Sequence, residues 1–209
     1  MDGNTTRCYD GILKMQIELG EVTKISAAPV FRGQAPRAEE SGNVYALTIR
    51  DLISGWPLNI ARLAKISVDE RQKLSCLNGG EVLIPSRGNN YPARLMPTQI
   101  GSSFIYPHGQ INIITPAENV VGGYITWCLN LPEVQAQISR SLTGTAIQAL
   151  TKVQLLKIKI PMADLREQLV VAELQETWGE TKRVGANWIS LKEQEIDAAC
   201  RTFIAKGRE

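Results

Sequence analysis

The chain has 209 residues, enough for one domain with a full hydrophobic core or for one domain followed by an extended segment. Hydrophobic residues make up 44% of it, yet no apolar run approaches the roughly 18 residues that would cross a bilayer, and the N-terminal segment lacks a signal-peptide pattern. The formal net charge of +2 is low for a protein that binds nucleic acid. The composition therefore predicts a globular protein of the cytoplasm with no membrane segment.

Charge is distributed unevenly along the chain. Residues 1–160 hold 16 Lys and Arg against 12 Asp and Glu, or +4, whereas residues 161–209 hold 7 against 9, or −2. A mildly basic body and a mildly acidic tail suggest different partners for the two parts, although imbalances of this size also occur on ordinary solvated surfaces.

Residues suited to metal binding or catalysis are sparse. The four cysteines occur singly, without a C-x-x-C pair, and His108 is the only histidine, so the sequence predicts no zinc site, no disulfide scaffold and no cofactor. His108 stands in a Pro-His-Gly turn without a G-x-S-x-G nucleophile motif, and Cys128 lies in an expected buried segment. Adjacent carboxylates lie in polar stretches where nothing would raise their pKa for acid–base work. The chain is therefore predicted not to be an enzyme.

Four segments in the first two thirds of the chain have the residue pattern of β-strands. They are residues 14–25 (KMQIELGEVTKI), 44–49 (VYALTI), 81–85 (EVLIP) and 111–115 (INIIT). In the first of them the alternation runs around Gly20, which fits either a short strand or a strand that enters a turn. The first two are separated by residues 27–43, a stretch rich in Pro, Gly and small residues that predicts a long loop. Gly79-Gly80 precedes the third strand and predicts a tight turn, because neither phosphate-binding glycine motif surrounds it.

The following segments are less uniform. Residues 118–131 predict a helix, with a strand as the alternative, and Pro132 then opens a helix (PEVQAQISRSL) that Gly144 ends. Residues 153–160 (VQLLKIKI) return to a period of two and predict a last strand.

From residue 163 to about residue 205 the chain lacks proline and its apolar residues recur at helical spacing. Positions that alternate by four and three are Val170, Leu174, Thr177, Thr181, Val184, Trp188, Leu191, Glu195 and Ala198, and six of these nine are apolar. A helix of this length is on the order of 60 Å long, so its apolar residues need a partner beyond the preceding domain. The alternative is two shorter helices that fold back across Gly179–Gly185.

Recognition chemistry concentrates in the loop that follows residues 81–85. Arg87, Asn89 and Asn90 carry the groups that read base edges, since Arg bonds guanine and Asn bonds adenine bidentately in the major groove. Four further arginines are predicted to hold phosphates or bases: Arg32, Arg37, Arg50 and Arg94. The Asn-Asn-Tyr-Pro sequence differs in residue order from the Asn-Pro-Pro-Tyr motif of amino-methyltransferases, and no glycine-rich cofactor loop precedes it.

The order of these segments resembles a type I restriction-modification DNA specificity (S) subunit nearly from end to end. IELGEVTKISAAPVFRG resembles the family's opening Leu-Gly-Asp/Glu-Val and small-residue loop, VYALTIRDLISG its strand ending in Asp-Leu/Ile and a glycine, and LNGGEVLIPSRGNNYPARLM its Gly-Asp-Ile-Leu-x-Ser-Arg-x-Gly segment. INIITP, LTGTAIQALTKVQLLKIKIP and ADLREQLVVAEL resemble its later strand, a Gly- and Leu-containing stretch and the entry to its long helix. The chain departs from the family at IPMADLREQ, where members usually have a Pro-x-Pro-Pro-Leu run, and at Glu81, which replaces an aspartate.

The resemblance implies an α/β (α+β) fold. It implies one target-recognition domain at residues 1–160, with a mixed and strongly curved sheet, followed by a spacer and dimerisation helix at residues 161–209. Members usually have two recognition domains and two long helices, so this chain is expected to be a half-subunit. Its helix would pair with that of a second half-subunit, identical or different, as an antiparallel coiled coil, through residues such as Leu174, Val184, Trp188 and Leu191.

By the same resemblance the chain is a non-catalytic subunit. It would direct methyltransferase subunits, and restriction subunits where they are present, to a bipartite site on double-stranded DNA, because a symmetric dimer reads a symmetric site. The alternative is a regulatory or protein-interaction module that binds the methyltransferase without reading DNA, which the low net charge mildly favours. Salt dependence separates the two, since phosphate contacts weaken as salt rises.

Overall fold

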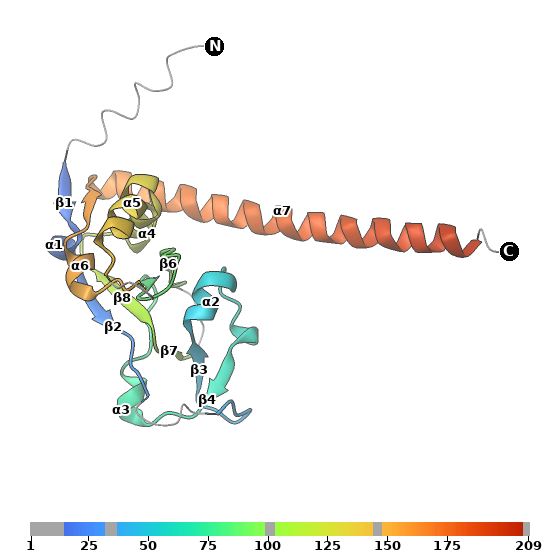
Figure 1. Ribbon diagram of the computed structural model, residues 1–209, viewed down its shortest axis with the longest axis horizontal. Helices are drawn as coiled ribbons and strands as arrows, with labels where there is room; N and C mark the ends of the chain where they lie inside the picture. Colours follow the sequence, from blue (N-terminus) through green and yellow to red (C-terminus); the bar gives the residue numbers. More distant parts are fainter. Residues whose placement is uncertain (1–14, 32–36, 99–102, 144–147, 207–209) are drawn as a thin grey trace, which may run out of the picture. The chain divides into compact units, whose positions relative to one another are not determined.

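The computed structural model describes residues 15–31, 37–98, 103–143 and 148–206, with side chains through Ile204. Within these ranges the chain has the predicted mixed α/β fold, with a curved, unclosed sheet and a long C-terminal helix (Figure 1). It divides into two compact units, Met1–Ala172 and Glu173–Glu209.

The first unit contains a four-stranded antiparallel sheet. Its strand order is β2 (Thr23–Ala27), β8 (Ile111–Pro116), β5 (Val82–Pro85) and β6 (Arg94–Leu95). Both faces of β5 are buried, because Val82 and Ile84 pack into one hydrophobic core and Leu83 packs into another. A strand buried on both faces needs apolar residues at every position, which explains its continuous apolar run.

A second, mixed sheet lies beside the second core. Its order is β4 (Ala64–Ile66), β3 (Val44–Leu47) and β7 (Ile105–Pro107), with β3 antiparallel to β4 and parallel to β7. Leu47 and Ile105 pack into the core that holds Leu83, whereas Val44 and Tyr106 pack into a smaller core on the other face. The turn at residues 108–110 joins β7 directly to β8 and so connects the two sheets.

Residues 14–25, predicted as a short strand or as a strand that enters a turn, contain two strands separated by a helical turn. β1 (Gln16–Glu18) pairs with β9 (Lys159–Pro161), and α1 (Leu19–Val22) leads from β1 into β2. Glu18 and Glu21 form a capping box that starts the turn. The turn lies close to Leu156, since a Cβ added at Gly20 would be 2.9 Å from its Cδ2 atom.

Capping boxes also correct two other strand predictions. Thr48 and Asp51 start α2 (Ile49–Ser54), so the strand predicted over residues 44–49 ends at Leu47. Thr151 and Gln154 start α6 (Lys152–Leu156). The strand predicted over residues 153–160 is therefore wrong for its first half, and only the short β9 remains extended.

The other short elements lie between the predicted strands or cover the sheets. They are the 3-10 helix η2 (Ile60–Arg62), α3 (Glu70–Lys73), α4 (Gly122–Asn130) and α5 (Pro132–Ser141). α4 decides the helix-or-strand alternative for residues 118–131 in favour of a helix, and α5 begins at Pro132 as predicted. Gly144, the predicted end of that helix, lies outside the described residues. Gly80 has a φ of +84°, which fits the predicted Gly-Gly turn before β5.

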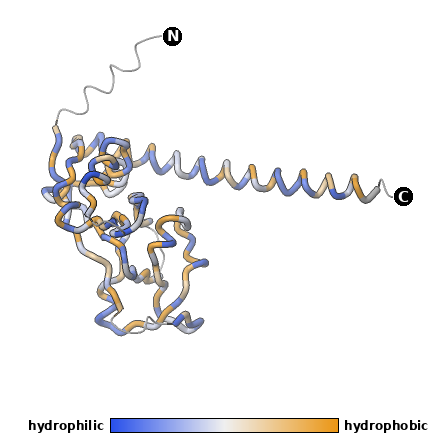
Figure 2. Tube along the Cα trace, viewed as in Figure 1, coloured by the Kyte–Doolittle hydropathy of each residue, from blue (hydrophilic) through white to orange (hydrophobic). Residues whose placement is uncertain are grey.

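α7 (Leu165–Lys206) is one continuous helix of 42 residues. It passes through Gly179 and Gly185 without interruption, so the alternative of two folded-back helices is wrong. Its start is capped by Asp164, whose carboxylate accepts a hydrogen bond from the Glu167 amide at 2.9 Å. Apolar and polar residues alternate along it (Figure 2). None of the helices in the described part of the chain is both long enough and apolar enough to cross a membrane.

The first turns of α7 are anchored in the first unit. Gln168 is 1% exposed; its Oε1 atom accepts a hydrogen bond from the Val121 amide at 3.0 Å, and its Nε2 atom donates to the Ala163 carbonyl at 2.9 Å. Ala172 packs against α4 so closely that a Cβ added at Gly123 would lie 2.8 Å from the Ala172 Cβ atom. The helix therefore starts from a fixed position on α4.

Candidate functional site

The ends of several strands meet where the two sheets join. The antiparallel registers place Ala27 of β2 beside Asn112 of β8, and Pro85 of β5 beside Ile111. The parallel register places the end of β3 beside the end of β7. β7 continues into β8 through residues 108–110, and the end of β3 and the segments that follow β2 and β5 all contact this turn.

We call the polar surface at this place the junction surface. Its residues come from the loops after β2, β5 and β7 and from the segment that follows residue 147, and they are Phe31, Arg87, Asn89, Asn90, His108, Gln110 and Gln148. His108 and Phe31 are half-buried, and the others are exposed.

Backbone hydrogen bonds fix the turn at the centre of the junction surface. The His108 amide donates to the Leu47 carbonyl at 2.9 Å, and the Gly109 amide donates to the Pro29 carbonyl at 3.0 Å. The Gln110 carbonyl accepts from the Ser86 amide at 2.9 Å. Gly109 has a φ of +85°, a left-handed conformation that favours glycine. The turn is therefore held by three separate segments of the chain.

The loop that carries the predicted base-reading residues is also fixed by its backbone. The Leu150 amide donates to the Ser86 carbonyl at 2.9 Å, and the Gly88 amide donates to the Gln148 carbonyl at 3.3 Å. That same carbonyl accepts from the Tyr91 hydroxyl at 2.9 Å. The side chains that the sequence predicts to read bases, those of Arg87, Asn89 and Asn90, are exposed on this loop. The loop thus presents hydrogen-bonding groups from an ordered backbone.

Two amide side chains hold the far end of the same loop. Asn130 pairs with both backbone groups of Ala93, accepting from its amide at 3.0 Å and donating to its carbonyl at 2.9 Å. The side-chain Nε2 atom of Gln135 donates to the Tyr91 carbonyl at 2.9 Å. Asn130 ends α4 and Gln135 lies in the first turns of α5, so these helices position the loop.

The four predicted phosphate-binding arginines have different surroundings. Arg37 and Arg50 are exposed, and Arg50 lies in α2 directly after the end of β3. Arg94 is half-buried; its Nε atom donates to the Leu52 carbonyl at 3.1 Å, and burial lowers the pKa of its guanidinium. Arg94 therefore ties β6 to α2, and a contact with DNA would have to use its remaining N–H groups. Arg32 lies outside the described residues.

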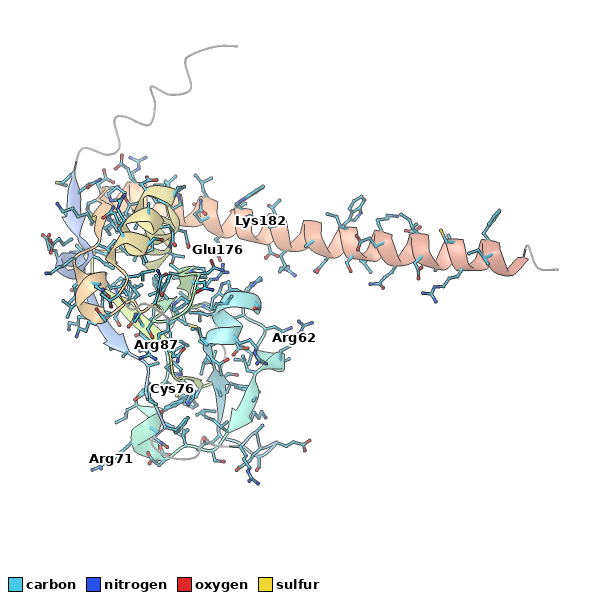
Figure 3. The ribbon with its side chains drawn as sticks, in the orientation of Figure 1. Arg62, Arg71, Cys76, Arg87, Glu176 and Lys182 are labelled. Atoms are coloured by element: carbon cyan, nitrogen blue, oxygen red, sulfur yellow. The ribbon has the colours of Figure 1, made fainter. Side chains whose placement is uncertain are left out.

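Other exposed arginines lie elsewhere on the first unit. Arg62 in η2 and Arg71 in α3 are both well separated from Arg87 (Figure 3). They offer matched comparisons for Arg87, because they carry the same charge at a distance from the junction surface.

Cys128, one of the nucleophile candidates, is withdrawn from solvent. It is fully buried in α4, and burial raises the pKa of its thiol to about 12. Its Sγ atom lies 3.7 Å from the Pro161 carbonyl, as a weak donor. Burial therefore favours the protonated thiol, which is a much weaker nucleophile than the thiolate.

Sequence reasoning did not connect residues 108–110 with the Arg87 loop. The two segments are far apart in the chain, and their proximity follows from the pairing of β5 with β8. The available signal was the Pro-His-Gly turn immediately before a strong strand, because such a turn had to lie at a strand end. Nothing in the sequence showed which other strand ended beside it.

The second unit presents an apolar stripe, which we define as six side chains of α7. They are Leu174, Trp178, Trp188, Ile189, Ile196 and Phe203, and they are between 54% and 83% exposed. The predicted contact residues Leu174, Val184, Trp188 and Leu191 are likewise exposed. In a straight helix of 3.6 residues per turn, positions seven residues apart do not stay on the same face along the whole helix. Trp178, Ile196 and Phe203 therefore lie on the same face as Leu174, although the predicted spacing by four and three omitted them.

No protein-family model matches the chain, and no curated protein matches it. Several solved structures share its fold. Three of them are the S subunit of a type I restriction-modification system from M. genitalium (11% identity, TM-score 0.55), the HsdS subunit from Thermoanaerobacter tengcongensis (17%, 0.56) and a chain from a study of the assembly of the type I R-M system (15%, 0.57).

The matches cover most of this chain and less than half of each solved structure. They span 79%, 81% and 87% of this chain, but only 39%, 39% and 45% of the other chains, in the same order. The resemblance found in the sequence is therefore confirmed for the fold, and the matched region spans about two fifths of the length of each S subunit.

Proposed function

We propose that this chain, which has the fold of about one half of a type I restriction-modification S subunit, is a non-catalytic DNA-recognition subunit. The first unit would read double-stranded DNA through the junction surface. α7 would bind a second half-subunit and the methyltransferase subunits that carry out the chemistry, together with a restriction subunit where one is present. Such a complex would act on DNA in the cytoplasm. The observation that carries this proposal is the fold shared with two S subunits and with a chain from a structure of the type I R-M system.

The chemistry of the junction surface supports DNA as the ligand. Its exposed groups are one guanidinium and several amides, which can hydrogen-bond base edges directly. The loops that carry them are fixed by backbone hydrogen bonds, so little conformational entropy is lost when they bind. Arg37, Arg50 and Arg87 are exposed and available for phosphates or bases, and the proposal keeps Arg32 and Arg94 as further candidates.

The apolar stripe supports a second copy of the chain as the partner of α7. An antiparallel pair centred on Gly185 would place Leu174 opposite Ile196 and Thr181 opposite Ile189, because each pair is equally distant from residue 185 in the sequence. Gly185 would let the two helices approach closely at the centre, since no atom lies near the position of its missing Cβ. In this register each Trp178 would face Lys192 of the partner subunit, which allows a cation–π contact.

The proposal is tested by measuring how specifically the chain binds DNA when it is assembled with its type I methyltransferase. We expect specific binding that weakens steeply as salt rises, and methylation at an interrupted palindrome if two identical half-subunits pair. Arg87→Ala should reduce discrimination at one base pair by roughly 5- to 150-fold, whereas Arg62→Ala, the matched control, should leave it unchanged.

Two results would count against the proposal. Assembly with the methyltransferase without salt-dependent DNA binding would favour the regulatory or protein-interaction module, which the low net charge also fits. Wild-type specificity in a variant carrying both Arg87→Ala and Asn89→Ala would show that the reading residues lie elsewhere.

A further inference from the structure

We infer that the turn formed by His108, Gly109 and Gln110 is a second base-reading element, in which Gln110 contacts the edge of an adenine and His108 holds the turn in position. The inference rests on the proposed DNA-recognition function and extends it to Gln110, which is not among the predicted base-reading residues.

Gln110 combines a fixed backbone with an exposed side chain. Its carbonyl accepts the Ser86 amide at 2.9 Å, and the next residue, Ile111, is fully buried at the start of β8. The Gln110 side chain is exposed and forms no hydrogen bond to another residue in the described ranges. An ordered backbone with an exposed amide is suited to reading a ligand at a defined place.

His108 is held by a column of aromatic rings. Its ring stacks on that of Phe31, with 4.7 Å between centroids and 25° between planes. Phe31 in turn lies 5.5 Å from the ring of Tyr106, which is 2% exposed in the core. The column therefore connects the turn to the interior. His108 acts as a positioning residue, and another aromatic ring of similar size should serve in its place.

The side chain of Gln110 offers the chemistry of base recognition. Its amide has both a donor and an acceptor, and glutamine bonds adenine bidentately at N6 and N7 in the major groove. The hydrogen bond from Ser86 to Gln110 joins this turn to the root of the loop that carries Arg87. The two elements should therefore read neighbouring base pairs of one half-site.

The test measures binding of the chain, assembled with its methyltransferase, to a library of DNA duplexes that vary one base pair at a time. Gln110→Ala should reduce the preference for adenine at one position by roughly 5- to 150-fold and leave the other positions unchanged. Gln16→Ala replaces an exposed glutamine of β1 and serves as the control. His108→Phe should keep the wild-type preference, whereas His108→Ala should weaken it at the Gln110 position.

Several outcomes would overturn the inference. A uniform loss of affinity in Gln110→Ala, with a smaller salt slope, would mean that the residue contacts phosphate. Unchanged preferences in Gln110→Ala, or a loss in His108→Phe equal to that in His108→Ala, would also contradict it. If the wild-type complex shows no sequence preference, the proposed function itself fails, whereas a specific wild-type complex with an unaffected Gln110→Ala variant rejects only the inference. Urea unfolding of each variant checks that it is folded.

Discussion

Asn130 shows how a single side chain can organise a loop that it does not belong to. It satisfies both backbone groups of Ala93, which is 1% exposed and would otherwise leave an amide and a carbonyl unpaired. Together with the bonds to Tyr91, it fixes the loop that presents Arg87. The precision of the candidate site therefore depends on residues that would not themselves touch DNA.

Replacing Asn130 by alanine should lower the free energy of unfolding. The buried Ala93 amide would lose its partner, which costs roughly 1–3 kcal/mol. Asn187→Ala, at an exposed position of α7, should change stability by no more than about 0.5 kcal/mol. Urea unfolding of both variants measures the difference. Equal stability of the two variants would show that water replaces the Asn130 amide without loss.

At the residue scale, the sequence predicted an exposed polar loop around Arg87, but it did not predict the surroundings of that loop. Arg87, Asn89 and Asn90 could be selected because a polar loop after a buried strand is exposed in most folds. The position of Arg94 depends on the distant Leu52, and that of Gln110 depends on strand pairing. Neither relation leaves a pattern in the local sequence.

At the scale of elements, helices and strands with strong local sequence signals were predicted correctly. The continuous apolar run of β5, the proline that opens α5 and the long helical periodicity of α7 all predicted the observed elements. The strand predicted for residues 153–160 was wrong in its first half because a short apolar segment fits either a strand or a helix. The Thr151–Gln154 capping box starts a helix there. Capping boxes likewise end β3 at Leu47 and start the helical turn within residues 14–25.

Two glycine substitutions in helices should have opposite effects. Gly179→Ala should stabilise α7 by roughly 1 kcal/mol, because alanine favours a helix and its Cβ would meet no atom within 4 Å. Gly123→Ala offers the same gain in α4, but its Cβ would lie 2.8 Å from the Ala172 Cβ atom. Overpacking of this kind typically costs about 1–3 kcal/mol, so this variant should be less stable than the wild type.

Circular dichroism at increasing temperature and urea unfolding measure both effects. A Gly123→Ala variant as stable as the wild type would mean that the first turns of α7 shift easily on α4. A Gly179→Ala variant with unchanged helicity would mean that a partner, rather than helix propensity, determines the order of this segment.

At the scale of the whole molecule, the unpartnered helix is the strongest sign that this chain acts in an assembly. The second unit contains no buried residue in its described part, and its large apolar side chains, including Trp178 and Trp188, are more than half exposed. Exposed apolar surface of this extent along one helix is typical of an interaction site. Helix periodicity predicted a long amphipathic helix but only Leu174 and Trp188 of the six residues in the stripe.

Engineered cysteines test the proposed helix pairing and its direction. In a variant with Cys8 and Cys200 changed to serine, Gly185→Cys should form a disulfide between two copies, because residue 185 would face its own equivalent. Thr181→Cys should not, since it would face Ile189. Non-reducing electrophoresis would show a species of twice the 23.0 kDa chain mass for the first variant alone.

The outcomes distinguish the possible arrangements. If the two helices were parallel, both the Gly185→Cys and the Thr181→Cys variant would cross-link. If the chain were monomeric, neither variant would. If the Thr181→Cys variant cross-linked and the Gly185→Cys variant did not, the helix pair would not be centred on Gly185. Light scattering of the wild-type chain with and without its methyltransferase shows whether pairing requires that partner.

The turn between β7 and β8 has a consequence for how such a protein changes its target over evolutionary time. The candidate readers Arg87, Asn89 and Gln110 are held through backbone bonds, and their side chains share no partner in the described ranges. Replacing one should therefore leave the others in place, so that their effects on binding approach additivity. A lineage could then exchange its preferred base pairs one at a time, while selection on folding acts on a separate set of residues.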